Sequence, residues 1–393
     1  MLSHLLLALT LLVSAANAEE VASHGTLIVL NKSDDTASFI DTATGRTLSQ
    51  LPTGGGPHEV AVSPDGRTAV VANYGSVQGG AFVSGHTLSV YDLATRTVRS
   101  VIDLELNERP HGIQFVGGNE KVVVTVESRS RVVVVDVPGE RVVRSISTEA
   151  GGSHMLVASP DGKRVYTANM GSASVSVLDL ENGRYVTSIP TGAECEGIDI
   201  TPDGAQVWAS NRAANTISVI DTASLEVVAE LPCADFPIRV KITPDGERAL
   251  VSNARSSEVV VFDIAEREEI GRITIDFDIV DDAGERLFGE RMKGSATPIG
   301  VLIPPDGRHA FVAAANADVV TQVDLETLEV VRGFETGNEP DGLGWTLVTP
   351  SLDPTNPTGP ATEAGTDVAD DKTGESAQEP DDQSPSGQEQ GDH

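Results

Sequence analysis

Short apolar stretches and polar turns alternate in a fixed order along most of the chain. Each unit contains an apolar stretch, the turn Pro-Asp-Gly, a second apolar stretch that ends on Asn and a third that ends on Asp. The turn occurs at Pro64–Gly66, Pro160–Gly162, Pro202–Gly204, Pro244–Gly246 and Pro305–Gly307. The turn residues Asp161, Asp203 and Asp245 follow one another at intervals of 42 residues, the length of one four-stranded propeller blade.

One copy of the unit indicates how it folds. Its apolar runs cover residues 155–159, 164–168, 175–180 and 185–189. Gly162 supplies the positive φ that the first turn needs, and Asn182-Gly183 is typical of a hairpin turn. A four-stranded antiparallel sheet cannot bury both faces alone, so such blades stack in a ring, and the ring must close.

The number of units predicts seven blades. Five carry Pro-Asp-Gly, and a sixth has Phe115-Val116-Gly117-Gly118 in place of the turn. The remaining strands lie at residues 26–30, 37–41, 47–51 and 342–348. We therefore predict an all-β, seven-bladed propeller within residues 19–350, built from four-stranded antiparallel blades and closed by N- and C-terminal strands in one blade.

The second apolar stretch of each unit ends on a related tetrapeptide. It reads Val70-Val71-Ala72-Asn73, Tyr166-Thr167-Ala168-Asn169, Trp208-Ala209-Ser210-Asn211 and Leu250-Val251-Ser252-Asn253. These units resemble the YVTN-type seven-bladed propeller repeats of periplasmic, lactonase-like propellers. The resemblance implies a fold and a compartment, and it leaves the reaction open, because propellers of this type include hydrolases, redox enzymes and plain binding proteins.

The first 18 residues have the pattern of a secretory signal peptide. An apolar run from Leu5 to Val13 precedes the small-residue end Ala16-Asn17-Ala18, and the run is too short to span a bilayer as a helix. We expect cleavage after Ala18 and a protein that is periplasmic or secreted, with no membrane insertion.

The chain is strongly acidic, with 27 basic and 59 acidic residues and a net charge of −32. Residues 351–393 contain 11 acids and one Lys and contribute −10, which leaves −22 on the remainder. The negative electrostatic field of such a protein argues against binding of nucleic acid and favours binding of cations or basic partners. Adaptation to a saline habitat explains the acidic composition equally well. Residues 351–393 have almost no aliphatic side chains, so we predict a disordered tail. We expect a monomer.

The repeat register brings one set of polar residues to a common level. The position seven residues before the turn Asp opens the innermost strand of each blade, at the mouth of the central channel. Around the ring it holds His58, His111, His154, Glu196, Ile238, Ile299 and Asp341. Because the ring closes, Asp341 lies beside His58, and five consecutive blades offer a ligand-type side chain.

Three imidazoles with flanking carboxylates suit a zinc or transition-metal site that keeps one coordination position open to the channel. We therefore predict metal binding by His58, His111, His154, Glu196 and Asp341, with zinc, copper, iron or calcium as the ion. Zinc or calcium would favour lactone or ester hydrolysis, and copper or iron would favour an oxidase.

Two other interpretations of the same residues stay open. In the first, these residues only line a water-filled channel and have no function. In the other, the protein is a non-enzymatic binding or scaffold propeller that takes a small molecule or a protein ligand on this face.

The end of the second strand holds an Asn in most units. These residues are Asn31, Asn73, Asn169, Asn211 and Asn253, and we expect their side chains to bond loop backbone. Glu127 takes this place beside His111, so Glu127 is a candidate base or orienting acid. Glu196 is the other candidate base.

Two insertions are predicted on the same face as the histidines, where loops over a rigid scaffold usually determine specificity. They are residues 75–86, rich in Gly, and residues 276–295. The second contains Asp276, Asp278, Asp281, Asp282, Glu285 and Glu290.

The two cysteines, Cys195 and Cys233, lie in loops that enter innermost strands of adjacent blades. A disulfide, a thiolate metal ligand and two free thiols are all open alternatives.

Overall fold

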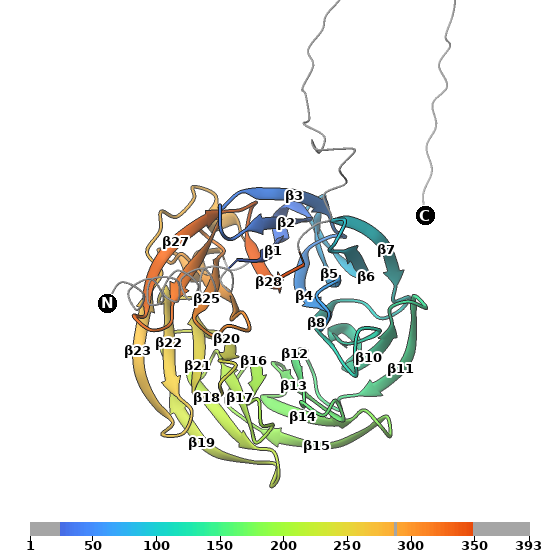
Figure 1. The fold of residues 1–393 in the computed structure, drawn as a ribbon. Helices are drawn as coiled ribbons and strands as arrows, with labels where there is room; N and C mark the ends of the chain where they lie inside the picture. The colour runs from blue at the N-terminus through green and yellow to red at the C-terminus, as the bar shows by residue number, and fades with distance from the viewer. Residues whose placement is uncertain (1–23, 287–288, 349–393) are drawn as a thin grey trace, which may run out of the picture. The chain divides into compact units, whose positions relative to one another are not determined.

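The computed structural model describes residues 24–286 and 289–348, and most of these lie in β-strands or tight turns. They form seven four-stranded antiparallel sheets, arranged as blades around a central axis (Figure 1). The prediction of an all-β, seven-bladed propeller is confirmed. The predicted signal peptide, residues 1–18, and the predicted tail, residues 351–393, lie outside the described residues. Within the described part, no helix has the length and apolar character that a membrane span requires.

Six blades follow one another along the chain, each with its strands in order from the axis to the rim. They contain β4 (Pro57–Val62), β5 (Thr68–Gln78), β6 (Ala81–Asp92) and β7 (Thr97–Asp103); β8 (Pro110–Phe115), β9 (Lys121–Val126), β10 (Arg131–Asp136) and β11 (Arg141–Ser147); and β12 (Ser153–Ala158), β13 (Arg164–Asn169), β14 (Ser174–Asp179) and β15 (Arg184–Pro190). The next three contain β16 (Cys195–Ile200), β17 (Gln206–Asn211), β18 (Thr216–Asp221) and β19 (Glu226–Pro232); β20 (Pro237–Ile242), β21 (Arg248–Asn253), β22 (Glu258–Asp263) and β23 (Glu268–Thr274); and β24 (Pro298–Leu302), β25 (His309–Ala314), β26 (Val319–Asp324) and β27 (Glu329–Glu335).

The seventh blade joins the two ends of the described chain. Its strands are β28 (Pro340–Thr346), β1 (Thr26–Asn31), β2 (Thr36–Asp41) and β3 (Thr47–Pro52), in the order β28-β1-β2-β3. The C-terminal β28 pairs antiparallel with β1, with Ile28 opposite Gly344. This is the predicted closure, and it ties the ring together with backbone hydrogen bonds between segments some 300 residues apart in the sequence.

Four of the five Pro-Asp-Gly turns share one hydrogen-bond pattern, and the fifth, which follows Pro304, keeps only the backbone bond of that pattern. In the first, the Ser63 hydroxyl donates to Asp65 at 2.6 Å, and the Gly66 N–H donates to the Ser63 carbonyl at 2.8 Å. Gly66 has a φ of +71°, which an L side chain rarely adopts. The Ser-Pro-Asp-Gly or Thr-Pro-Asp-Gly sequence therefore favours, by local interactions alone, the turn between the two inner strands of a blade.

The predicted bond from the recurring asparagines to loop backbone is confirmed for Asn31 and Asn73. Asn73 donates to Thr87 and Ser89 on the third strand at 3.0 Å each, and its amide oxygen accepts the N–H of Gly54 at 3.0 Å. Asn73 thus fastens two strands of its blade to the loop that enters the blade. Asn31 is bonded in the same way, whereas Asn169 bonds Ser and Thr hydroxyls, and the buried Asn211 Oδ1 has no hydrogen-bond partner among the described residues.

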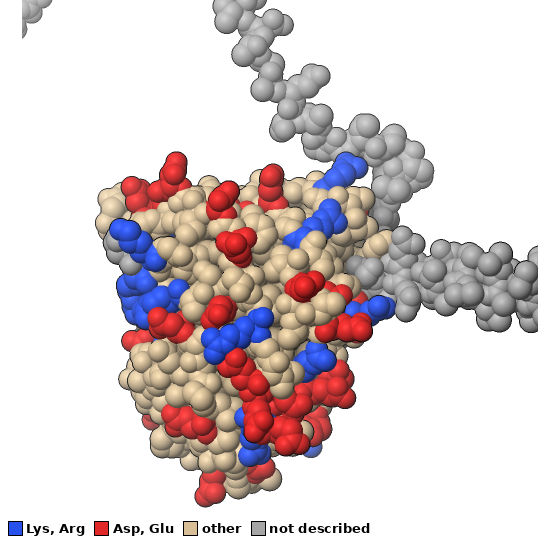
Figure 2. Space-filling model, turned by 90° about the vertical axis from the view of Figure 1, so that its left-hand side faces the viewer, with Lys and Arg blue, Asp and Glu red and all other residues tan. Residues whose placement is uncertain are grey.

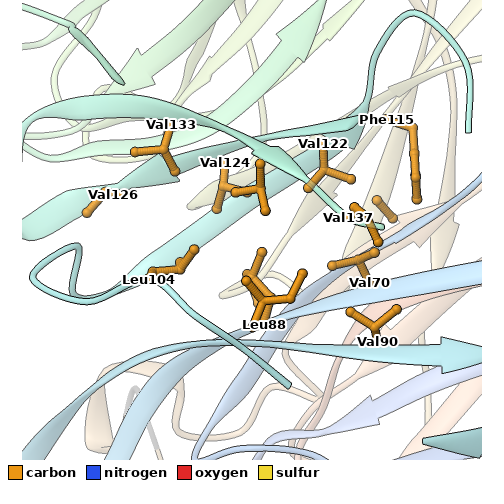
Figure 3. Packing of buried hydrophobic residues seen from close by; sticks show 14 residues of the cluster. Val70, Leu88, Val90, Leu104, Phe115, Val122, Val124, Val126, Val133 and Val137 are labelled. Carbon is orange, nitrogen blue, oxygen red and sulfur yellow. The ribbon is translucent and has the colours of Figure 1, made fainter. Parts of the chain in front are cut away.

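Hydrophobic clusters fill the spaces between adjacent blades. Figure 3 shows the cluster between the β4–β7 and β8–β11 blades, where Val70, Leu88 and Val90 face Val122, Val124 and Phe115. The second and third strands of most blades are buried along most of their length, and successive side chains face opposite neighbours: Val70 and Ala72 lie in this cluster, and Ala69 and Val71 lie in the cluster on the other side of the blade. The charged residues stay largely outside: acidic and basic side chains lie next to one another on the face displayed in Figure 2.

We expected residues 75–86, which are rich in Gly, to form a loop. They instead extend a β-hairpin. β5 and β6 continue as paired strands to the turn at Gly79-Gly80, where both φ values are positive, +58° and +83°. Phe82 and Val83, near the tip, are 47% and 46% exposed.

In four blades the innermost strands lie so close together that only glycine fits at one position. This position follows the predicted ligand position directly and holds Gly112, Gly197, Gly300 and Gly342 in four of the seven blades. A Cβ atom on Gly300 would lie 2.1 Å from the Asp341 carbonyl oxygen, and a Cβ on Gly342 would lie 2.3 Å from the His58 carbonyl oxygen. These glycines let the backbones of neighbouring inner strands approach closely.

Candidate functional site: an axial cavity with three histidines

The predicted arc of polar residues forms one wall of a cavity on the propeller axis. Each of the seven residues is the second residue of its innermost strand, which is why one register position describes them all. The cavity has a volume of about 250 Å³ and is lined by His58, Tyr74, His111, His154, Met170, Glu196, Arg212, Ile238, Arg239, Arg291, Ile299 and Asp341. The structure therefore brings all five candidate ligands together.

The three imidazoles lie in contact with one another. The ring centres of His58 and His111 are 5.0 Å apart, and those of His111 and His154 are 3.6 Å apart with the planes tilted by 37°. Tyr74 packs against the first two rings, with ring centres 4.6 and 5.4 Å away. All three histidines are buried.

The three rings differ in protonation. Burial lowers the pKa of His58 to about 4, and burial beside the other two imidazoles lowers the pKa of His111 well below its usual value. Both are neutral at pH 7. Because the His58 Nδ1 donates to the Gly56 carbonyl at 2.9 Å, its Nε2 carries a lone pair. The buried His111 Nδ1 has no hydrogen-bond partner among the described residues.

His154 is held by carboxylates on both ring nitrogens. Its Nδ1 bonds Glu127 Oε1 at 2.7 Å, and its Nε2 lies 3.5 Å from Glu196 Oε1. Burial lowers the pKa of His154, but the hydrogen bonds to Glu127 and Glu196 outweigh it and raise the pKa above the usual value. His154 is therefore the imidazole in this cavity whose surroundings favour the protonated form.

Glu127 orients His154 from behind rather than lining the cavity. Its second oxygen accepts a hydrogen bond from the Tyr74 hydroxyl, and Arg109 lies 3.8 Å away. Burial alone would raise the pKa of Glu127, but the His154 contact and the Tyr74 bond hold it below its usual value. An ionised Glu127 fixes the ring orientation of His154, as carboxylates do for functional histidines.

The two carboxylates of the predicted ligand set are already paired with cations. Glu196 contacts Arg212 at 2.6 Å and Arg239 at 3.3 Å. Burial opposes ionisation of Glu196, but His154 and the two guanidinium groups lower its pKa to about 2. Such a carboxylate is a weak base, so its predicted role as a catalytic base does not suit its surroundings.

Asp341 is paired in the same way. Lys32, a buried lysine of the 3-10 turn η1 (Lys32–Asp34), lies 3.3 Å from Asp341 and 3.2 Å from Glu339. Burial would raise the pKa of Asp341, but Lys32, His58 and Arg239 together lower it.

Arg239 is the main residue that the sequence analysis missed. It is buried, bonds Glu59 Oε1 at 2.8 and 3.2 Å, and lies 4.0 Å from Asp341. Both Arg239 and Glu59 occupy the register position that holds glycine in four other blades. The glycines leave room for these two long side chains. The opposite charges of Arg239 and Glu59 at one register position were the sequence signal that could have predicted this ion pair.

These contacts decide what the cavity can hold. Among the described residues, no group of three or more His, Cys, Asp or Glu side chains is arranged so that it could hold a metal ion. Two imidazoles that share one ion have ring centres about 5 Å apart, given metal–nitrogen bonds of about 2 Å. The His58–His111 pair has this spacing, whereas His111 and His154 are too close. Metal binding by the whole arc stays a prediction.

The second insertion reaches the cavity, as predicted. It contains the short 3-10 turns η3 (Ala283–Glu285) and η4 (Gly289–Met292), and Arg291 lines the cavity. Arg286 anchors the segment, because its guanidinium bonds both carboxylate oxygens of Asp318, at 2.5 and 2.9 Å. The first insertion contributes less directly: its Phe82 packs against Tyr74, and the Arg109 guanidinium lies beside both rings, 5.2 Å from the centre of Phe82 and 4.9 Å from that of Tyr74.

Both cysteines are free thiols in the structure, so the disulfide alternative is not formed there. Cys195 is buried in the cluster between the β12–β15 and β16–β19 blades, and Cys233 donates to Asn253 Oδ1 at 3.2 Å. Burial raises the pKa of each thiol to about 12, which keeps both protonated and argues against a thiolate ligand.

Comparisons with known proteins agree with this architecture. A hydrazine synthase structure from Kuenenia stuttgartiensis is 19% identical, with a TM-score of 0.61 over 76% of this chain and 96% of that one. A functionally unknown protein from Desulfotomaculum acetoxidans is 15% identical, with a TM-score of 0.66 over 83% of this chain and 99% of that one. At these identities the likeness concerns the fold alone, and no curated protein matches the chain.

The family comparison is more specific. The model of the family described as "Lactonase, 7-bladed beta-propeller" matches residues 18–279, more than half of the chain. The chain therefore belongs to the seven-bladed β-propeller lactonase family.

Proposed function

We propose that this protein is an exported hydrolase that opens a small lactone or ester in the axial cavity, with His154 as the proton-transfer group. One observation carries the proposal: His154 is oriented by Glu127 through Nδ1 at 2.7 Å, has a raised pKa, and lines the axial cavity. A carboxylate–histidine pair of this kind is what general acid–base catalysis requires. Membership of the lactonase family supports the substrate class.

The reaction needs few groups. Neutral His154 takes a proton from water as the water oxygen bonds to the carbonyl carbon, and the imidazolium returns a proton to the ring oxygen when the ester C–O bond breaks. The product is a hydroxy acid, so atoms and charges balance. Glu127 holds the imidazole and stabilises its charged form. Arg212, Arg239 and Lys32 keep Glu196 and Asp341 ionised, so those carboxylates contribute to the field of the cavity and not to proton transfer.

The test is hydrolysis of a panel of small lactones and aryl esters by the metal-depleted protein. We expect Glu127→Gln and His154→Gln each to lower kcat/KM by about 10²–10⁴, because each removes the oriented acid–base group. The wild-type profile should rise with pH through the pKa of His154, and Glu127→Gln should move that rise to lower pH, since the anion that raises the pKa is gone.

The matched control is Glu149→Gln, an exposed glutamate in a loop at residues 148–152 that should leave the rate unchanged. Activity that survives in His154→Gln would contradict the proposal. Absence of turnover with every substrate, together with saturable binding of a lactone, would instead assign a non-enzymatic binding propeller.

A second candidate function is binding of a transition metal by His58 and His111. It is favoured by their 5.0 Å spacing, the free Nε2 of His58 and the unpartnered, buried Nδ1 of His111. The ion would be zinc, copper or iron, since two neutral imidazoles suit these metals. Bound there, zinc would polarise a carbonyl or activate water, and copper or iron would supply redox chemistry.

Metal content separates this candidate from the first. We expect elemental analysis of protein purified from the periplasm, or reloaded with zinc or copper, to show one ion per chain that is lost in His58→Ala and in His111→Ala. His154→Gln should retain it, because the His154 ring lies too close to that of His111 for the two to share an ion. No metal in wild-type protein after reloading would remove this candidate and leave the acid–base proposal untouched.

A further inference from the structure

A second cavity lies on the propeller axis below the histidine cavity. Its volume is about 460 Å³, within the range of small-molecule sites. Residues from the lower halves of the innermost strands form its wall, and Pro64 and Pro305 of two Pro-Asp-Gly turns lie at its edge. This cavity therefore opens on the face of the ring opposite the histidines.

The two cavities are separate compartments. Of the residues that line them, Arg239 alone belongs to both. Its guanidinium spans from β20 to Glu59 on β4 and to Glu196 on β16, so one buried ion-pair layer forms the floor of each cavity. A ligand in the lower cavity would not contact the histidines, and this inference is independent of the proposed function.

Most residues that line the lower cavity have aliphatic or aromatic side chains, while polar and apolar atoms contribute about equally to its exposed surface. Its aliphatic and aromatic side chains include Val60, Ile113, Phe115, Val301, Leu343 and Trp345. Trp345 is stacked on Phe311, with ring centres 5.5 Å apart, which fixes its position at the edge of the cavity. The apolar part of a ligand would contact these side chains, and an oxygen on it would take the place of water at the polar atoms.

The polar groups of this cavity balance in charge and leave two donors available. Arg239 and Lys241 are matched by Glu59 and Asp199. Lys241 Nζ lies 3.5 Å from Asp199, a long contact for three N–H donors. Gln114 uses its amide oxygen to accept the Ala158 N–H at 2.8 Å, so its NH₂ group can donate elsewhere. A charged ligand would find no unmatched charge here, whereas a carbonyl or hydroxyl oxygen would find a donor.

We propose that the lower cavity is a second ligand site, for a small uncharged molecule with an apolar ring or chain and a carbonyl or hydroxyl oxygen that bonds Lys241 or Gln114. The strongly acidic character of the protein fits this class, because a net charge of −32 disfavours the approach of anions.

The probe for this site is prodan, an uncharged naphthalene ketone whose emission shifts to the blue in apolar surroundings. We expect saturable binding to the wild-type protein. Val301→Trp, which fills the cavity, should weaken binding at least about tenfold, and Lys241→Met, which keeps the stem and removes the donor, should weaken it about three- to tenfold. His111→Ala, on the other side of the Arg239 layer, should change it less than about twofold, because it does not line this cavity.

Four results would overturn the proposal. The first is no blue shift with wild-type protein up to the solubility limit of prodan, and the second is binding by both Val301→Trp and Lys241→Met that equals wild-type binding. The third is a loss in His111→Ala as large as the loss in those two variants. The fourth is binding of the anionic dye anilinonaphthalene sulfonate as tight as that of prodan. Lys241 is half-exposed and its substitution should not unfold the protein, so the test stands even if Val301→Trp folds poorly.

Discussion

Replacement of Arg239 by Met is expected to lower the free energy of unfolding by about 3–5 kcal/mol at pH 7, because it breaks a buried ion-pair layer from one side. Arg239 is 7% exposed and contacts Glu59, Glu196 and Asp341. Glu196 keeps Arg212, and Asp341 keeps Lys32, but Glu59 loses the only cation that contacts it among the described residues. The cost is mainly that of an unpaired buried carboxylate.

A double variant tests this cause. Burial already raises the pKa of Glu59 in the presence of Arg239, so Glu59→Gln should remove the unpaired charge and restore a large part of the loss in the Arg239→Met background. Urea unfolding with unchanged slope measures both steps. The matched control is Arg272→Met, whose guanidinium bonds Glu269 at 2.6 Å but is 44% exposed, so the expected loss is about 0–1 kcal/mol. A loss below about 1 kcal/mol in Arg239→Met, or no recovery in the double variant, would show that the layer is not a stabilising element.

The repeat register predicted the level of the site but not its electrostatics. His58, His111 and His154 could be placed because strand periodicity and ring closure fix where the second residue of each inner strand lies. The pairing of Arg239 with Glu59 could not be placed in this way, since it joins two residues 180 positions apart by side chains that cross the channel. Periodicity describes backbone positions, and it carries no information about where a long side chain ends.

The carboxylates illustrate the same limit. Glu196 and Asp341 were predicted as ligands from residue type and level alone. Their actual partners, Arg212 and Lys32, come from the connections between second and third strands, where the repeats differ from one another. Those connections also decide that Glu127 orients His154 rather than facing a substrate. Irregular segments that meet only in the folded ring therefore determine the chemistry of this site.

Replacement of Gly300 by Ala is the second change with a large expected effect. An added Cβ would lie 2.1 Å from the Asp341 carbonyl oxygen and 3.1 Å from its carbonyl carbon. These are backbone atoms of β28, the strand that closes the ring, so no side-chain rotation can relieve the contact. The two inner strands must separate, and we expect the free energy of unfolding to fall by about 3 kcal/mol, at the upper end for overpacked sites.

The displaced atom belongs to a residue of the histidine cavity, so the same change should also disturb function. If β28 shifts, Asp341 moves relative to Lys32, and the cavity loses one of its ion pairs. Gly151→Ala is the matched control: Gly151 is exposed, its φ is not positive, and an added Cβ would meet only the Ser172 hydroxyl at 3.6 Å. That variant should unfold within about 0.5 kcal/mol of the wild type. Equal stability of the two variants in urea would mean that the inner strands have freedom to move apart, and the channel would then be adjustable instead of fixed by its glycines.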